Sequence, residues 1–381
     1  MEQFNLLDAP MPDPLVETDA VPMQGIPPQL DLFARRPREE EPPEPPPART
    51  FVLTAPAPPR QRPATSPVEP SPIDPAEAEV AAALPPGIRL GTSSWSFPGW
   101  KGLVYDSAYT EERLARDGLR AYAAHPTFRT VALDRGYYAP VPVTAHRDYA
   151  EAVPAPFSFV LKALEELMVA NFPRHPRYGV RAGKPNPRFL DPTAAIAEVI
   201  GPAIEGLGPK LGPIVFQAPP QNVLAMGGTR RTLERLEAFL GALPRGPTYA
   251  VEFRNSEFLT ADLGAVLRNV GAVPCLSVHP TLPRIGVQAK LLGALEFPTL
   301  VLRWLLRSGL SYEAAVERYS PFDRIVDDDP ETRASVAAAA FRFFEQDKAA
   351  YVIVNNKAEG SSPLSTRLLA GEIVKLIQTR R

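Results

Sequence analysis

Cysteine is almost absent from this sequence, since Cys275 is the single one in 381 residues. A disulfide bond within the chain is therefore excluded, and a reducing compartment is the natural environment of such a protein. The chain also has no uninterrupted apolar run long enough to cross a bilayer, and its first residues lack the basic region and the apolar segment of a secretory signal. We therefore expect a soluble, cytoplasmic protein.

Motifs for metal and nucleotide binding are also missing. The four histidines show no His-x-x-x-His spacing, and a single cysteine cannot form a Cys-x-x-Cys pair. The sequence contains no Walker loop, no Gly-x-Gly-x-x-Gly and no Gly-x-Ser-x-Gly. Nucleotide triphosphatases, dinucleotide enzymes and α/β-hydrolases are therefore disfavoured, and we predict neither a metal site nor a cofactor.

Proline, in contrast, is abundant and unevenly placed, because 22 of the 47 prolines fall within residues 1–86. The same stretch has 14 acidic and 6 basic residues and thus a charge of −8, which leaves +6 for the rest of a chain whose net charge is −2. Few aromatic residues and a high net charge are typical of disorder. We predict a disordered tail over residues 1–86 and one folded domain over residues 87–381.

From residue 88 onward, short β-rich runs alternate with longer helical patterns. Strands are expected over 88–92, 129–134, 157–162, 213–217, 249–253, 273–278, 299–304 and 351–355. Helices are expected over 110–124, 144–152, 192–207, 229–243, 260–269, 311–318, 330–346 and 364–379. This order and this length match an α/β fold, a (β/α)8 barrel of the TIM type. A doubly wound open sheet is the alternative.

Polar residues follow almost every expected strand. In barrels of this type the functional groups come from the carboxyl ends of the strands and from the loops after them. A lysine and two arginines at such ends are well suited to hold an anion. The sequence therefore predicts an anion-binding mouth, whose candidate residues are Trp95, Asp134, Tyr138, Lys162, Gln217, Glu252, Arg254, Arg303, Asn355 and Asn356.

Two of these residues are candidate catalytic groups. Glu252 suits general acid or base chemistry if the pocket raises its pKa, and Lys162 suits phosphate binding or, when desolvated, Schiff-base formation. Each also has a structural interpretation. Glu252 and Arg254 lie two apart on one strand and so form an ion pair on one face, while Lys162 neutralises Glu252. Both interpretations remain open.

The other candidates are assigned to substrate binding, again with alternatives. Trp95 could stack a base or a sugar at the mouth, or it could plug its loop onto the barrel rim. Asn355 and Asn356 could hydrogen-bond a ligand, or they could shape the turn that leads to Gly360.

Five short motifs, in order along the chain, resemble the domain of unknown function 72 (DUF72), also called YecE-like. The resemblance covers roughly residues 88–380 and implies a (β/α)8 barrel. The first motif reads Gly-Thr-Ser-Ser-Trp-Ser-Phe-Pro-Gly-Trp-Lys-Gly over residues 91–102, and the third reads Leu-Gly-Pro-Lys-Leu-Gly-Pro-Ile-Val-Phe-Gln-Ala-Pro-Pro over residues 207–220. The others are Phe-Ser-Phe-Val-Leu-Lys-Ala over 157–163, Val-Glu-Phe-Arg over 251–254 and Tyr-Val-Ile-Val-Asn-Asn over 351–356.

The chain also departs from the pattern of this family. Its second strand typically reads Val-Glu-Ile-Asn, whereas residues 131–134 read Val-Ala-Leu-Asp, so Ala132 stands where a carboxylate is expected. Asn255 stands in place of the usual histidine, and His279 in place of the usual aspartate. These departures imply that the pocket of this chain is altered, and they leave an inactive pocket open.

The tail contains an island of apolar side chains between prolines, residues 29–33. Such islands in disordered segments are commonly docking motifs. The pentapeptide resembles the motif that binds the bacterial sliding clamp, Gln-Leu-(Ser/Asp)-Leu-Phe, at every position. The resemblance implies a polar contact for the first residue and burial of the three apolar ones, the residues being Gln29, Leu30, Asp31, Leu32 and Phe33. A chance match is the alternative.

Two functions follow from these observations. The first is an enzyme of hydrolase or lyase type, acting on nucleic acid or on a small phosphorylated metabolite, with Glu252 and Lys162 at its centre. The second is a non-catalytic adaptor whose barrel binds nucleic acid or protein while the tail recruits the clamp. Both describe a tethered barrel connected with DNA replication or repair, without a membrane partner.

Overall fold

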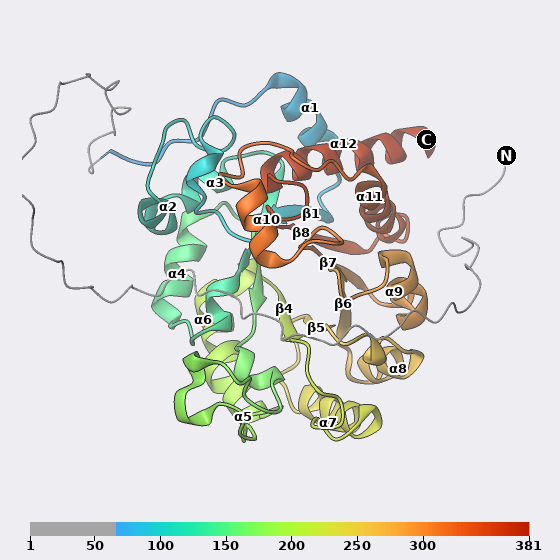
Figure 1. Ribbon diagram of the computed structural model, residues 1–381. Coiled ribbons are helices and arrows are strands. Elements are labelled where there is room, and N and C mark those ends of the chain that lie inside the picture. Colours follow the sequence, from blue (N-terminus) through green and yellow to red (C-terminus); the bar gives the residue numbers. More distant parts are fainter. Residues whose placement is uncertain (1–65, 381) are drawn as a thin grey trace, which may run out of the picture. The chain divides into compact units, whose positions relative to one another are not determined.

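The folded part of the chain is a closed barrel of eight parallel strands (Figure 1). The structure, a computed structural model, describes residues 66–380. The strands pair in chain order, and β8 closes the barrel by pairing with β1. The predicted TIM-type barrel is therefore confirmed, and the open sheet is wrong. The strands are β1 Ile88–Thr92, β2 Phe128–Leu133, β3 Ser158–Lys162, β4 Leu211–Ala218, β5 Tyr249–Phe253, β6 Val273–Val278, β7 Thr299–Trp304 and β8 Ala349–Val354.

Helices surround the strands (Figure 1). They are α1 Pro75–Ala83, α2 Glu111–Asp117, α3 Leu119–Ala123, α4 Val143–Ala152, α5 Pro192–Ala195, α6 Gly201–Leu207, α7 Thr229–Gly241, α8 Ala261–Val270, α9 Ile285–Leu292, α10 Tyr312–Tyr319, α11 Pro330–Phe344 and α12 Ser362–Arg380. A π-helical turn, Ile196–Ile200, joins α5 to α6, and short 3-10 turns include η2 Asp134–Tyr137, η3 Glu165–Met168 and η4 Pro176–Arg181. No helix among residues 66–380 is long and apolar enough to cross a membrane.

The strands are buried on both faces, which is why they are nearly continuous apolar runs rather than alternating ones. Ile88, Phe216, Val301 and Ile353, from four different strands, expose none of their surface. Each such side chain contributes about 1.5–3 kcal/mol by leaving water. The barrel wall therefore holds the polar residues at the strand ends on a rigid frame.

Several helices begin at capping side chains that the sequence already contains. The hydroxyls of Thr110, Thr260 and Ser311 each accept a hydrogen bond from the backbone N–H three residues later. The carboxylate of Asp329 does the same for the Thr332 N–H at 3.1 Å, at the start of α11. These caps fix where the loops at the mouth end and the outer helices begin.

The sequence predicts no helix between β6 and β7, whereas α9 lies there. Its start has no capping side chain, and Gly286 and Val287 in its first turn are weak helix formers. The side chain of Gln288, within α9, attaches the helix to β6. Its Oε1 accepts from the Ser277 N–H at 3.1 Å and its Nε2 donates to the Ser277 carbonyl at 2.8 Å. Such a contact between a helix and a strand leaves no signal in the local sequence.

The N-terminal strap, residues 66–86, is ordered, and this corrects the predicted extent of the disordered tail. The strap begins beside the loop that follows β1, where the Ser71 N–H donates to the Val104 carbonyl at 2.8 Å. It then forms α1, which Asp74 caps and which packs on α12. The prediction used the average composition of residues 1–86, which is dominated by proline-rich segments and does not reveal this short helix.

The strap ends at the floor of the barrel, where the strands begin. There the guanidinium group of Arg129, at the start of β2, donates to the carbonyls of Ala81, Leu84 and Pro85 at 2.8, 2.9 and 2.6 Å. Carbonyls at a helix end have no partner within the helix, so this contact caps α1. The strap therefore runs from the mouth side of the barrel to its floor.

Candidate functional site

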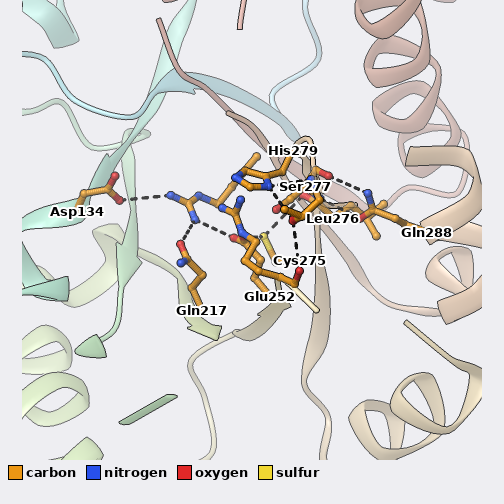
Figure 2. A network of polar contacts seen from close by, with 11 residues as sticks. Asp134, Gln217, Glu252, Cys275, Leu276, Ser277, His279 and Gln288 are labelled. Atoms are coloured by element: carbon orange, nitrogen blue, oxygen red, sulfur yellow. Dashed lines mark hydrogen bonds and ion pairs between the residues drawn. The ribbon is translucent and has the colours of Figure 1, made fainter. Parts of the chain in front are cut away.

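Glu252 is the centre of a polar network inside the mouth of the barrel (Figure 2). It belongs to β5 and exposes none of its surface. Its Oε1 lies 2.5 Å from Nε of Arg254, and its Oε2 accepts a hydrogen bond from Nη1 of Arg303 at 2.8 Å. One buried carboxylate is thus held by two guanidinium groups, so three predicted residues from the ends of two strands, β5 and β7, meet in one place.

The register of the strands explains this meeting. Glu252 pairs with Gln217 of β4, so these two side chains are neighbours on the inner face of the barrel. Nη1 of Arg303, from β7, donates to Oε1 of Gln217 at 3.0 Å. The thiol of Cys275, from β6, donates to Oε2 of Glu252 at 3.6 Å. Four strands therefore contribute to a single network.

The ionisation of Glu252 decides between its two interpretations. Burial by itself raises the pKa of Glu252, but the charges of Arg254 and Arg303 outweigh burial and hold this pKa well below the usual range of a glutamate. The carboxylate is therefore ionised throughout the neutral range and has no proton to donate. The structure favours the structural ion pair over general acid catalysis by Glu252.

Lys162 ends β3 and exposes 8% of its surface. Its Nζ lies 3.5 Å from the centre of the Tyr137 ring, a cation–π contact. Among residues 66–380 its ammonium group has no hydrogen bond or ion pair, so Lys162 acts on Glu252 only through its charge, which helps to lower the pKa of that carboxyl after the larger effects of Arg254 and Arg303. Burial lowers the pKa of Lys162 to about 8.

Lys357 is a second buried lysine at the mouth, and it is absent from the predicted site. It follows β8, exposes 8% of its surface and places its Nζ 4.3 Å from the centre of the Tyr312 ring in α10. Within the described residues its ammonium group likewise has no hydrogen bond or ion pair. Burial lowers its pKa to about 8. Its position directly after Asn356, in the loop of the eighth strand, was the available signal.

Asp134 acts on both lysines. Its charge raises the pKa of Lys162 and of Lys357, against the larger effect of burial. Its Oδ1 is 3.7 Å from Nη2 of Arg303, and Figure 2 shows it at one end of the network. Because Asp134 follows Ala132 by two residues, it supplies a carboxylate nearer the mouth than the one that the family pattern leads us to expect at position 132.

The mouth carries more positive than negative charge. The two arginines and two lysines described above face only two carboxylates, which leaves a surplus of two positive charges. These groups are enclosed by a buried apolar wall, where charges interact more strongly than in water. The arrangement is therefore suited to attract and hold an anion.

His279 follows β6 and belongs to the same network (Figure 2). Its Nδ1 accepts from the Thr281 N–H at 3.3 Å and lies 2.9 Å from the Thr281 hydroxyl. Burial and, after it, the charge of Arg254 lower the pKa of His279 to about 3. The ring is therefore neutral near pH 7 and carries its proton on Nε2, which makes that nitrogen a hydrogen-bond donor.

The two asparagines after β8 have different surroundings. Nδ2 of Asn355 donates to Oγ of Ser93 at 2.8 Å and so joins the loops after β8 and β1. Oδ1 of Asn356 accepts from both the backbone N–H and the hydroxyl of Ser362, each at 2.8 Å. Asn356 therefore shapes the turn before α12, which was the alternative to ligand binding.

The two predicted aromatic residues, Trp95 and Tyr138, also differ in their surroundings. Trp95 is buried, donates from Nε1 to the Leu114 carbonyl at 3.0 Å and meets Tyr149 edge-on at 5.6 Å. It plugs the loop after β1 onto the barrel, the second of its two interpretations. Tyr138 exposes 48% of its surface and lies edge-on to Tyr137 at 5.2 Å, so it is an exposed ring at the rim.

Metal-binding side chains do not gather at the mouth. Among residues 66–380 there is no group of three or more His, Cys, Asp or Glu side chains placed to hold a metal ion. Both carboxylates of the mouth are in ion pairs with Arg303. The predicted clamp-binding pentapeptide, residues 29–33, lies outside the described residues.

Comparison with protein families gives one match. The family described as "Protein of unknown function DUF72" matches residues 89–379, which is well over half of the chain. No curated protein sequence matches the chain.

Among solved structures, a DUF72 family protein is similar to this chain in fold. A DUF72 family protein from Enterococcus faecalis is 18% identical, covers 76% of this chain and 95% of its own, and has a TM-score of 0.52. A DUF72 family protein from Thermotoga maritima is 20% identical, covers 76% of this chain and 99% of its own, and has a TM-score of 0.48. At these identities the likeness extends to the fold alone.

Proposed function

The chain belongs to the DUF72 family, and from that premise we propose that the mouth of its barrel binds an anionic, phosphate-bearing ligand. In this proposal Lys162 and Lys357 contact the anion, and Nε2–H of His279 donates a hydrogen bond to it. Glu252 does not contact the ligand. It holds the guanidinium groups of Arg254 and Arg303 in place by its buried ion pairs.

The observation that carries this proposal is a pair of buried lysines whose ammonium groups form no ion pair or hydrogen bond within residues 66–380. A buried ammonium group is costly unless a hydrogen-bond acceptor or an opposite charge compensates it. Within residues 66–380 both lysines rest on aromatic rings instead, Lys162 on Tyr137 and Lys357 on Tyr312. An incoming phosphate supplies the missing acceptors, and the positive surplus of the mouth favours its entry.

A binding experiment tests this function. Inorganic phosphate and pyrophosphate are titrated into the full chain, and the melting temperature and the heat of binding are measured. We expect Lys162→Met and Lys357→Met each to lower the affinity at least tenfold, whereas Lys375→Met, an exposed lysine on α12, leaves it unchanged. Equal affinity in all four proteins contradicts the proposal.

The same geometry bears on whether the protein is an enzyme. Of the two predicted catalytic residues, Glu252 is fully engaged by arginines, while Lys162 keeps a free ammonium group with a lowered pKa. A hydrolase or lyase built on this mouth would therefore depend on Lys162. A non-catalytic adaptor needs only the binding function, and both classes predict the same loss of affinity in Lys162→Met.

We further propose that residues 29–33 bind a bacterial sliding clamp and so connect the barrel with DNA replication or repair. The proposal rests on the sequence of the pentapeptide. A pull-down with the clamp tests it, with Leu32→Ala/Phe33→Ala as the variant. Equal capture of the variant and the parent contradicts it.

A further inference from the structure

The segment between β3 and α5 contains a run of positive charge that the predicted site does not include. We call residues 169–190 the basic arm. Their five charged residues are all cationic, and the stretch has no aspartate or glutamate, the residues being Arg174, Arg177, Arg181, Lys184 and Arg188. Arg181 and Arg188 form ion pairs with Glu166 and Glu198, which lie outside this stretch. The cations that lack such a pair among residues 66–380 point to a partner of opposite charge.

Two of these cations, Arg174 and Lys184, belong to neighbouring backbone segments and have no counter-charge among residues 66–380. The Phe172 N–H donates to the Lys184 carbonyl, and the Gly183 N–H donates to the Phe172 carbonyl, both at 2.9 Å. The side chain of Arg174 crosses Gly183, so that a Cβ at that glycine would lie 3.4 Å from the Cγ of Arg174. Arg174 and Lys184 are exposed, and within residues 66–380 neither side chain has an ion pair or a hydrogen bond.

The arm is a rigid part of the rim. Nδ2 of Asn186 donates to the carbonyls of Glu166 and Val169 at 2.6 and 2.7 Å, which closes the base of the arm. Gln221, in the loop after β4, accepts from the Ala170 N–H at 2.7 Å. Since these contacts fix the backbone at the base of the arm, Arg174 and Lys184 extend from one small region of the rim, where both exposed side chains can contact an anion.

The arm also contacts the residue that supports Lys162. The hydroxyl of Tyr178, within the arm, donates to Oε2 of Glu165 at 2.7 Å. The hydroxyl of Tyr137 donates to Oε1 of the same carboxylate at 3.1 Å, and the Tyr137 ring carries the ammonium group of Lys162. The basic arm and the buried lysine of the mouth are therefore joined through one carboxylate.

We propose that the basic arm binds the sugar-phosphate backbone of a single-stranded nucleic acid while one phosphate of that strand occupies the mouth. The second half of this statement rests on the proposed function. A strand of nucleic acid carries regularly spaced phosphates, so it can occupy the arm and the mouth at once, whereas a small anion can occupy only one. A single strand is required because the lysines of the mouth are 92% buried and a duplex is too stiff to bend a phosphate into the barrel.

Fluorescence anisotropy of the full chain with a labelled single-stranded DNA oligonucleotide tests the inference. The double variant Arg174→Gln/Lys184→Gln is compared with Lys290→Gln/Lys375→Gln, which removes two exposed lysines on α9 and α12. We expect the arm variant to bind about tenfold more weakly near 100 mM salt and the control variant to bind as the parent does. The slope of log K against log salt should fall by about 1.4 in the arm variant, because each lost phosphate contact contributes about 0.7.

Three results would overturn the inference. The first is that both double variants bind the oligonucleotide more weakly by the same factor. The second is that polyglutamate binds the parent and loses affinity for the arm variant to the same extent. The third is that duplex DNA binds as tightly as the single strand.

The titration with inorganic phosphate separates this inference from the proposed function. Phosphate binding that depends on Lys162, without oligonucleotide binding, leaves the function of the mouth intact and removes the arm. Oligonucleotide binding that depends on the arm but not on Lys162 leaves the arm as a nucleic-acid surface and removes the mouth.

Discussion

Two buried glutamates in this molecule have the same exposure and opposite surroundings. Glu252 in the mouth and Glu359 beside α11 both expose none of their surface, and both contact arginine. Glu252 is shared by two arginines, whereas Arg333 is shared by three acids. Its Nη1 lies 2.6 Å from Glu359 and 2.8 Å from Asp328, and its Nε lies 2.8 Å from Glu372.

The pKa of each glutamate follows from the balance of arginines and acids around it. Arginines outweigh burial at Glu252 and lower its pKa, whereas burial raises the pKa of Glu359 despite Arg333. Glu359 also accepts from the Asp329 N–H at 2.8 Å, so its cluster joins the start of α11 to the loop after β8. The cluster around Glu359, in which acidic groups outnumber arginines, joins parts of the fold. The cluster around Glu252, in which arginines outnumber glutamates, is a candidate anion site.

The largest effect is expected from removing the charge of Glu252. Glu252→Gln leaves Arg254 buried without a carboxylate and Arg303 with only Asp134, at 3.7 Å, which should lower the free energy of unfolding by about 3–5 kcal/mol. Glu359→Gln should cost less, because Arg333 keeps Asp328 and Glu372 as partners. Chemical denaturation of the two variants measures both losses. A larger loss in Glu359→Gln would reverse the comparison.

Lys162 should destabilise the protein in the absence of ligand. Its folded pKa of about 8 lies below the ordinary lysine value of 10.5, so the unfolded chain binds more protons between these values and the stability of the parent rises with pH across that window. Below pH 8 the full cost is present. Lys162→Met should therefore be more stable than the parent at pH 7, by about 3 kcal/mol, with a difference that shrinks toward pH 10.5.

Denaturation curves at pH 7 and pH 10 measure this difference, and Lys375→Met, which is exposed, is the matched control. A Lys162→Met protein that is less stable than the parent at pH 7 would mean that the ammonium group has a compensating partner.

The acid cluster should give a pH dependence of the opposite kind. The pKa of Glu359 is raised in the folded state, so the folded chain binds more protons than the unfolded chain between its unfolded and folded pKa values. The stability that this group contributes should therefore rise as the pH falls through its folded pKa. Glu359→Gln should lack this component, and the difference between variant and parent at pH 5 and pH 8 measures it. A difference that is the same at both values contradicts the raised pKa.

Much of the mouth could be predicted because a barrel brings strand ends together. Once eight strands are placed in order, Lys162, Glu252, Arg254 and Arg303 must gather at one end, and they do. Lys357 lies beyond the end of β8, in a loop, where the sequence contains no periodic signal. The pairing of Glu252 with Arg303, from a strand that is not its neighbour, depends on barrel closure and side-chain conformation, which no local pattern encodes.

The smallest effect on stability is expected at His279, whose pKa reports directly on the surplus of positive charge at the mouth. Its folded pKa of about 3 lies below the ordinary histidine value of 6.5, so the parent should lose stability as the pH falls below 6.5, when the unfolded chain takes up a proton that the folded ring does not. His279→Gln should remove this loss, about 1.4 kcal/mol at pH 5.5, while its amide can still donate a hydrogen bond at the mouth. Phosphate affinity should then change equally with pH in both proteins between pH 5.5 and 7.5, since neither side chain changes its charge in the folded state. An affinity that rises at pH 5.5 only in the parent would mean that His279 becomes protonated in the mouth, and the positive surplus there would be smaller than the arginines and lysines imply.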